Sequence, residues 1–204
     1  MDQSLDCRGL ACPGPVLHCK KCVEADAPRT LTVLVDNEAA RENVSRFLSQ
    51  RGYAVVVDQQ PEGLSVLTAT AGDAAAPVPA AAASPSPAAS ENAGQTVAFL
   101  TADTIGRGDD ALGTKLMANF LATLPELGEK LWRIILVNGG VRLAVAGSPG
   151  LAQLKALEQA GVSILVCGTC LDFFGLLDKK EVGQTTNMLD VVTSLDLADK
   201  IIQI

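Results

Sequence analysis

The sequence places a cysteine directly before a proline near its start, in the stretch Cys12-Pro13-Gly14-Pro15. Proline lacks an N–H and holds φ near the helical value, so Pro13 suits the first position of a helix and Cys12 would be its cap residue. A sulfur atom there meets unpaired N–H groups and the positive end of the helix dipole, which favour thiolate over thiol. We therefore expect Cys12 to attack, or to carry, another sulfur atom. The alternative is a buried structural cysteine, because free cysteine is among the most buried residue types.

A second reactive pattern, Cys167-Gly168-Thr169-Cys170, follows the apolar run 163–166. The pattern predicts a turn from a strand into a helix, where N–H groups again favour thiolate. Cys170 is the expected carrier because it should lie nearer the helix start, and Cys167 stays open as the alternative. The competing interpretation is a pair of core cysteines on either side of a tight turn.

Another C-x-x-C, Cys19-Lys20-Lys21-Cys22, lies within a predicted helix. Together with Cys7 and Cys12 it could supply four thiolates to zinc, but structural zinc sites usually place each such pair in a turn. We therefore expect no metal, and expect these cysteines to pack or to act as resolving thiols. The single histidine, His18, is expected to be exposed on that helix.

No cofactor is expected either. The loop 105–110 resembles a phosphate cradle only superficially, because Asp109 and Asp110 would repel a phosphate and no Gly-Lys-Ser/Thr follows. We expect these two aspartates to form the acidic first turn of a helix instead. Arg107 and Arg142 either support a thiolate at the second site or are surface residues. Aromatic residues that could enclose a flavin are scarce.

Residues 1–71 alternate short strands and helices. Strands are expected at 3–8, 30–35, 53–58 and 64–70, with helices at 13–24 and from a cap at Asp36 or Asn37 to about 50. The order βαβαββ predicts one mixed sheet with two helices on one face, a two-layer α/β sandwich.

Residues 72–93 are almost wholly Ala, Pro and Ser. Such a composition cannot bury enough apolar surface to offset its ordering entropy, so we expect a flexible linker.

Residues 94–204 alternate continuous apolar strands with helices. Strands are expected at 96–101, 132–137, 163–166 and 200–204, and residues 141–146 could extend or pair with the sheet. The helix 109–124 is expected to turn Leu112, Leu116, Met117, Phe120 and Leu121 inward. The pattern predicts a three-layer parallel α/β domain of flavodoxin-like type. The loops 101–108, 138–141 and 167–174 should then gather beyond the carboxyl ends of the strands.

Composition excludes several classes of function. The net charge is −7 and only 3% of residues are aromatic, so nucleic acid is not an expected partner. The first residues have neither a basic leader nor an apolar core, and no run of eighteen apolar residues exists, so neither export nor membrane insertion is expected. Six cysteines in such a chain point to reduced thiols in the cytoplasm.

The first motif carries a family resemblance. Leu5-Asp6, Gly9 and Cys12-Pro13-x-Pro15 resemble the motif of the TusA/SirA family of sulfur carriers, in which the cysteine before the first proline carries a persulfide. The resemblance covers about the first 70 residues and gives no role to Cys7.

The second domain is similar to DsrE-like sulfurtransferase domains, which bear a cysteine after a central strand. The fusion and the sequence Cys-Gly-Thr-Cys-Leu-Asp resemble the YedF family, described as sulfurtransferase-like proteins linked to selenium metabolism. The resemblance implies a donor and an acceptor protein that react through thiols, and homo-oligomers formed through residues 94–204.

Three hypotheses follow. The first is a relay of sulfur or selenium, as a persulfide, between Cys12 and the Cys167/Cys170 site, in either direction. The second is a dithiol–disulfide oxidoreductase that uses Cys167 and Cys170. The third is a non-enzymatic regulator or scaffold.

Overall fold

A computed structural model describes residues 2–72 and 94–204, and the chain divides into two compact units that are described separately. The linker predicted over 72–93 lies, apart from Gly72, outside the described residues. No helix in the described parts of the chain is both long and apolar enough to cross a membrane.

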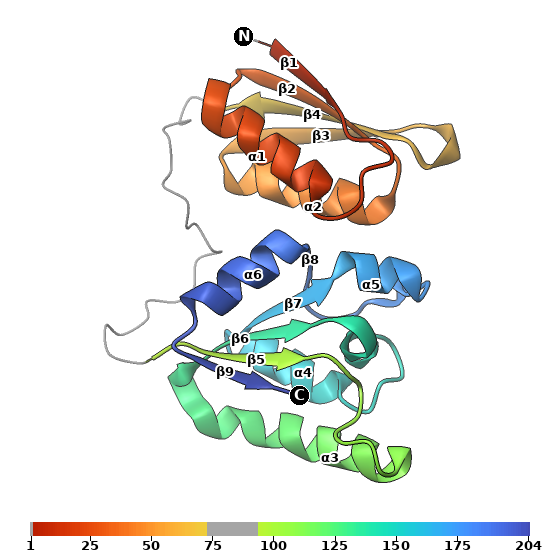
Figure 1. The fold of residues 1–204 in the computed structure, drawn as a ribbon, viewed down its shortest axis with the longest axis vertical. Helices are drawn as coiled ribbons and strands as arrows, with labels where there is room; N and C mark the ends of the chain where they lie inside the picture. The colour runs from red at the N-terminus through yellow and green to blue at the C-terminus, as the bar shows by residue number, and fades with distance from the viewer. Residues whose placement is uncertain (1, 73–93) are drawn as a thin grey trace. The chain divides into compact units, whose positions relative to one another are not determined.

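The first unit is a four-stranded mixed sheet covered by two helices (Figure 1). The strand order is β1-β2-β4-β3, with β1 and β2 parallel and the other pairs antiparallel. The strands are β1 (Asp2–Asp6), β2 (Thr30–Val35), β3 (Tyr53–Gln59) and β4 (Ser65–Ala71), and the 3₁₀ helix η1 (Pro61–Gly63) joins the last two. The predicted βαβαββ sandwich is confirmed.

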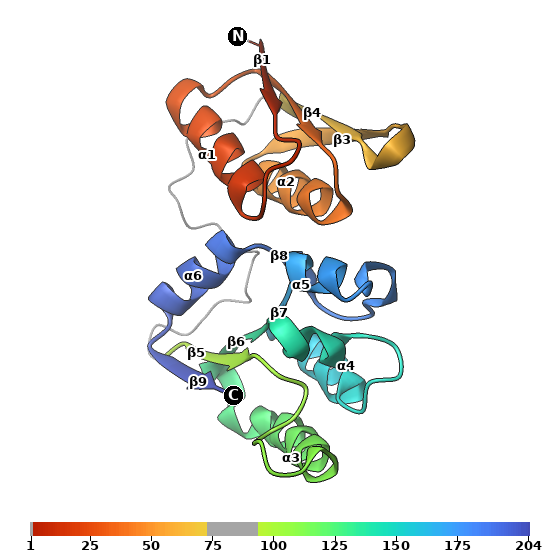
Figure 2. The ribbon, with the colours of Figure 1, turned by 45° about the vertical axis from the view of Figure 1, so that its right-hand side comes forward.

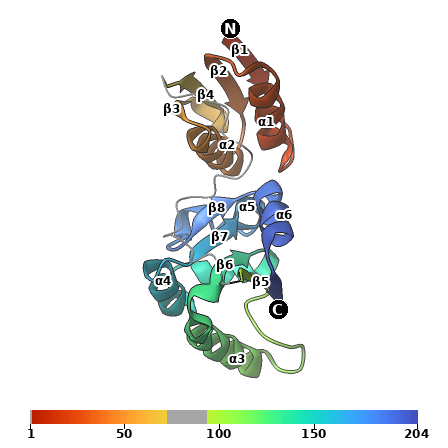
Figure 3. The same cartoon turned by 90° about the vertical axis from the view of Figure 1, so that its left-hand side faces the viewer.

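The alternation of buried and half-buried residues along β2 explains why helices cover one face of the sheet. Leu31, Val33 and Val35 are fully buried while the residues between them are half-buried, so one face of the sheet forms the core. The helices α1 (Gly14–Asp26) and α2 (Glu38–Gln50) cover that face (Figures 1 and 3). Asn37 caps α2 by accepting a hydrogen bond from the N–H of Ala40.

The second unit is a five-stranded, all-parallel sheet in the order β8-β7-β6-β5-β9. The strands are β5 (Thr96–Leu100), β6 (Leu131–Leu136), β7 (Ser163–Cys167), β8 (Gln184–Thr186) and β9 (Lys200–Gln203). The parallel α/β class is confirmed. In the flavodoxin order the second strand lies at the edge beside the first, whereas here the last strand, β9, takes that place beside β5.

Helices lie on both faces of this sheet, which makes three layers (Figures 2 and 3). One face, with Leu100, Leu136 and Val166, packs against α3 (Asp110–Thr123) and α4 (Leu151–Gln159). The opposite face packs against Val191 of α6 (Met188–Leu197). The remaining helices are α5 (Gly168–Phe173), η2 (Leu124–Lys130), η3 (Asn138–Ala144) and η4 (Leu177–Lys179).

The option that residues 141–146 extend or pair with the sheet is wrong. Residues 141–144 lie in η3, and Val145 makes only an isolated bridge with Lys180. A Cβ atom on Gly140 would lie 2.4 Å from the carbonyl oxygen of Leu100, so the chain turns tightly against β5. The apolar side chains of Val141 and Leu143 are therefore buried from a helical turn instead of from a strand.

The predicted inner face of α3 is also partly wrong. Leu112 is 55% exposed and Leu116 is 42% exposed, whereas Met117 and Leu121 are buried. The helix instead turns Gly113 toward the preceding loop, where an added Cβ atom would lie 3.0 Å from the carbonyl oxygen of Ile105. Gly113, Met117 and Leu121 follow a spacing of four and form the buried stripe.

Candidate functional site

Three loops meet at the carboxyl edge of the parallel sheet, as the strand pattern predicted. Gly139 approaches the loop after β5 so closely that an added Cβ atom would lie 3.5 Å from the Cα atom of Ala102. Arg142 forms an ion pair with Asp103 at 3.8 Å, and its guanidinium lies 4.5 Å from the ring centroid of Phe174. Residues 101–108, 138–142 and 167–174 therefore form one site.

These loops surround the sulfur atom of Cys170. This cysteine is the third residue of α5 and is partly exposed. The Cys167 thiol and the N–H of Asn138, whose nitrogen lies 3.1 Å from the Cys170 Sγ, both hydrogen-bond to it. These bonds, the Cys167 bond first, outweigh partial burial and lower the pKa of Cys170 to about 6. Cys170 is therefore largely thiolate at neutral pH.

Asn138 is a functional residue that the sequence did not single out, although the loop 138–141 was expected at this site. Its φ is +48°, in the left-handed region that Asn tolerates better than most residues. This turn at the end of β6 directs the Asn138 N–H at the sulfur of Cys170. The sequence signal that could have identified this turn is an asparagine that stands between a buried strand and two glycines.

Cys167 is the cap residue of α5 and is only 3% exposed. The expectation that Cys170 lies nearer the helix start is therefore wrong, because the helix begins at Gly168. The donors that lower the pKa of Cys170 are also different from those predicted. They are a neighbouring thiol and a backbone N–H of another loop, and the free N–H groups of its own helix have no part.

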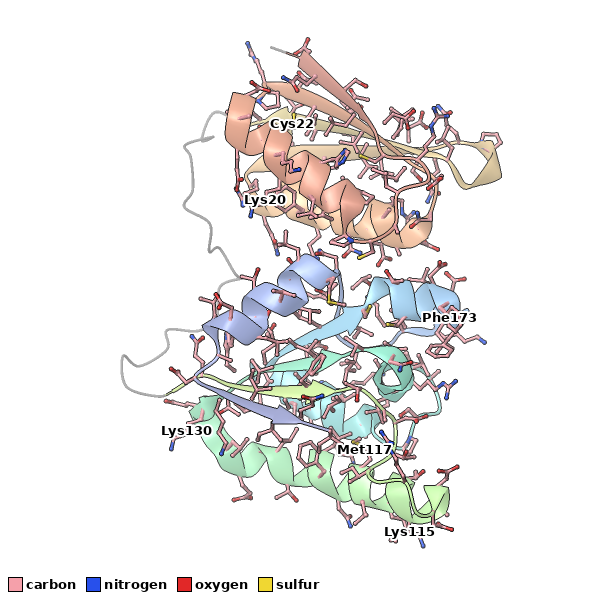
Figure 4. The ribbon with its side chains drawn as sticks, viewed as in Figure 1. Lys20, Cys22, Lys115, Met117, Lys130 and Phe173 are labelled. Atoms are coloured by element: carbon pink, nitrogen blue, oxygen red, sulfur yellow. The ribbon has the colours of Figure 1, made fainter. Side chains whose placement is uncertain are left out.

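Aromatic and charged side chains surround this sulfur site. The rings of Phe173 and Phe174 meet edge to face at 5.1 Å, and Phe173 is 82% exposed. Figure 4 shows the Phe173 side chain pointing away from the domain. Arg142 belongs to the site through Asp103 and Phe174, as one interpretation of the sequence had it, and Arg107 is exposed on the loop before α3.

Cys12 lies in the loop between β1 and α1 and is exposed. The prediction that it caps the helix is wrong by one residue. The first helical hydrogen bond runs from the N–H of Leu17 to the carbonyl of Pro13, so Pro13 is the cap residue and α1 begins at Gly14. The Cys12–Pro13 peptide bond is cis.

The loop that carries Cys12 is tied to the sheet. The N–H of Gly9 donates to Asp36 Oδ2 at 2.6 Å, and Gly9 has a φ of +68°. Arg8 pairs with Asp6, and this contact lowers the pKa of the Asp6 carboxyl to about 2. These contacts hold the loop across the carboxyl ends of β1 and β2.

The other three cysteines of the first unit are buried. Burial raises the pKa of Cys7 and Cys22, and raises that of Cys19, which also lies near those two thiols, to about 12. The Cys22 thiol donates to Gln3 Oε1 at 3.0 Å, and Figure 4 shows it on the side of α1 that faces the sheet. Within residues 2–72 and 94–204, no group of three or more His, Cys, Asp or Glu residues is arranged to hold a metal ion. His18 is exposed on α1, as predicted.

Comparison with known proteins assigns each unit. Residues 3–68 match the model of the sulfurtransferase TusA, and residues 96–204 match that of the DsrE/DsrF-like family. A protein of Methanocaldococcus jannaschii, named as a candidate sulfur carrier, is 39% identical over 61 residues, which are 29% of this chain and 81% of that protein.

Two solved structures are similar to one unit each. A SirA-like protein of Desulfitobacterium hafniense is 30% identical, with a TM-score of 0.32 over 35% of this chain and 99% of that one. The ychN protein of E. coli is 18% identical, with a TM-score of 0.44 over 54% of this chain and 99% of that one. The chain thus belongs to the DsrE/DsrF-like family through residues 96–204, and a TusA/SirA-like sulfur-carrier domain is fused in front of them.

Proposed function

We propose that the protein is a sulfur carrier or sulfurtransferase that relays a persulfide between Cys12 and the Cys167/Cys170 site. One observation carries the proposal: the sulfur of Cys170 accepts hydrogen bonds from the Cys167 thiol and the Asn138 N–H, which lower its pKa, in a loop site that leaves it partly exposed. A thiolate is the form of cysteine that attacks sulfur.

The transfer needs no external oxidant or reductant. The Cys170 thiolate attacks the outer sulfur of a persulfide on Cys12, a new sulfur–sulfur bond forms, and Cys12 leaves as a thiolate. The reverse step is the same chemistry with the two residues exchanged. The low pKa of Cys170 makes it a good leaving group as well as an available nucleophile.

The cargo and partners are part of this proposal. Sulfur is the expected cargo, and selenium is the alternative that the YedF resemblance suggests. A donor and an acceptor protein would exchange the cargo by thiol chemistry. Homo-oligomers would form through residues 94–204, where Leu112, Val192 and Leu197 are each at least half exposed.

The test is mass spectrometry of cysteine-containing peptides after incubation with a persulfide donor. The wild-type protein should gain one sulfur atom on Cys12 and on the Cys167/Cys170 peptide. Cys12→Ser and Cys170→Ser should each lose one of these adducts, and loading with a selenium donor should give the isotope pattern of selenium if selenium is also a cargo. If Cys12→Ser and Cys170→Ser both take up sulfur as the wild type does, the relay is wrong.

A dithiol–disulfide oxidoreductase is the second candidate, because the Cys167 thiol is in hydrogen-bonding contact with Cys170. It predicts reversible oxidation of this pair by a disulfide substrate and no dependence on Cys12. A protein that shows neither sulfur uptake nor a redox-active pair would be a regulator or scaffold.

A further inference from the structure

The two cysteines of the second site are arranged as a pair. Cys167 is the cap residue of α5 and Cys170 is the third residue of the helix, so their side chains lie on the same side of one turn. The Cys167 thiol contacts the sulfur of Cys170, and both residues pack in the same apolar cluster. Any sulfur atom carried by Cys170 therefore has a second thiol beside its inner, protein-bound sulfur.

We propose that Cys167 discharges a persulfide carried by Cys170 as hydrosulfide, an activity that rests on the carrier function proposed above. The sulfur of Cys167 attacks the inner sulfur, Cys170 Sγ, and a Cys167–Cys170 disulfide forms as the bond to the outer sulfur breaks. The outer sulfur leaves with the bonding electron pair as hydrosulfide and takes the proton of the Cys167 thiol. The sulfane sulfur is reduced, the two cysteines are oxidised, and no other reactant is needed.

Attack on the inner sulfur is favoured over attack on the outer one. Transfer of the outer sulfur to Cys167 would require room for an extra atom at a side chain that is only 3% exposed and packed in the core. A disulfide between these residues adds no atom at that position. Residues three apart at the start of a helix also have Cβ atoms about 5–6 Å apart, and a small backbone shift at this first turn brings them to the roughly 3.5–4.5 Å of a disulfide.

The pair would give a sulfur on Cys170 two fates. An acceptor thiolate that reaches the outer sulfur takes it as a persulfide, and without an acceptor Cys167 releases it as hydrosulfide. Each chain would release one hydrosulfide and stop with its pair oxidised until an external dithiol reduces it. The second domain would then both transfer sulfane sulfur and reduce it.

The experiment loads the full chain with glutathione persulfide at low temperature, removes the donor by desalting, and follows the protein at neutral pH. Hydrosulfide is measured with a sulfide electrode, and the peptide that contains both cysteines is measured by mass spectrometry. In the wild type the adduct should disappear as hydrosulfide and an internal Cys167–Cys170 disulfide appear in equal amounts. In Cys167→Ser, whose hydroxyl keeps a hydrogen-bond donor at this position, the adduct should persist at least about tenfold longer and no disulfide should form.

Cys22→Ser is the matched control, because it also replaces a buried hydrogen-bonding thiol but lies in the first unit, and its release rate should equal that of the wild type. Far-UV circular dichroism of the full chain confirms that each variant is folded. If Cys170 gains sulfur but wild type and Cys167→Ser lose it at the same rate, the discharge activity is wrong and the relay stands. If Cys170 gains no sulfur in either protein, the proposed relay fails as well.

Discussion

Cys170 and Cys19 show how surroundings set the chemistry of a thiol. Two hydrogen-bond donors stabilise the Cys170 thiolate, while the Cys19 thiol is fully buried and near two other thiols. Their pKa values consequently move in opposite directions from the same ordinary value, to about 6 and about 12.

We expect alkylation of Cys170 by iodoacetamide to follow this difference. Only the thiolate reacts, so the rate at Cys170 should rise with pH, reach half its maximum near pH 6 and stay constant above about pH 7. Cys19 should stay unmodified in the folded protein over this range. The measurement is peptide-resolved mass spectrometry, with the urea-unfolded protein as control, in which both cysteines should titrate alike. A midpoint for folded Cys170 at the unfolded value would contradict the assignment.

At the scale of elements, the first turn of η3 positions the donor of the site. Gly140 lies so close to Leu100 that no side chain fits there. We expect Gly140→Ala to destabilise the second unit by about 2–4 kcal/mol, because backbone must move. The same shift should raise the pKa of Cys170, because the N–H of Asn138 moves away from its sulfur.

Gly108→Ala is the matched control for that substitution. An added Cβ atom at Gly108 meets nothing within 4 Å, so the change should stay within about 0.5 kcal/mol. Urea unfolding followed by Trp132, the single tryptophan, measures both variants. Equal stabilities would show that the turn tolerates a side chain.

The cap of α6 should contribute more than the cap of α3. Asn187 is 1% exposed, and its Oδ1 accepts hydrogen bonds from the N–H groups of Leu189 and Asp190. We expect Asn187→Ala to cost about 1–2 kcal/mol, since two half-buried donors lose their partner. Asp109→Ala, at the exposed cap of α3, should cost about 0.5–1 kcal/mol in the same unfolding experiment. If Asp109→Ala cost more stability than Asn187→Ala, burial of the cap residue would not determine its contribution here.

Most elements could be predicted because their local signals agree with their burial. The strand at 30–35 is found where composition placed it, and the cap expected at Asp36 or Asn37 is Asn37. The strand β8 was missed because it has only three residues, Gln-Thr-Thr, whose burial comes from the neighbouring strand and not from apolar character. Residues 141–146, which could have extended the sheet by composition, do not do so, because the close contact at Gly140 turns the chain into η3.

At the scale of the whole molecule, each unit buries its own core. Leu31 and Leu48 are fully buried in the first, and Leu100 and Leu136 in the second. We expect separate chains of residues 1–72 and 94–204 to fold, because a domain with its own core does not need its neighbour. Circular dichroism and dispersed amide NMR spectra measure this. An unfolded spectrum for either piece would contradict the expectation.

The gathering of three loops at one sheet edge could be inferred from parallel topology, because all strands end there. The roles of the two cysteines could not be inferred. They depend on the exact residue where α5 begins and on the backbone conformation of Asn138, both of which are set by packing between loops distant in sequence. The cap of α1 was predicted one residue too early, because α1 begins at Gly14 and Pro13 is its cap residue.

The donor at Asn138 belongs to the main chain, so no replacement of the Asn138 side chain removes it, except by proline, which has no N–H. Homologous proteins could differ at this position and still keep an acidic thiol, provided that the chain follows the same path. Engineering of the reactivity should therefore target the length of this connection, since inserting or deleting one residue would displace the amide while leaving every cysteine in place.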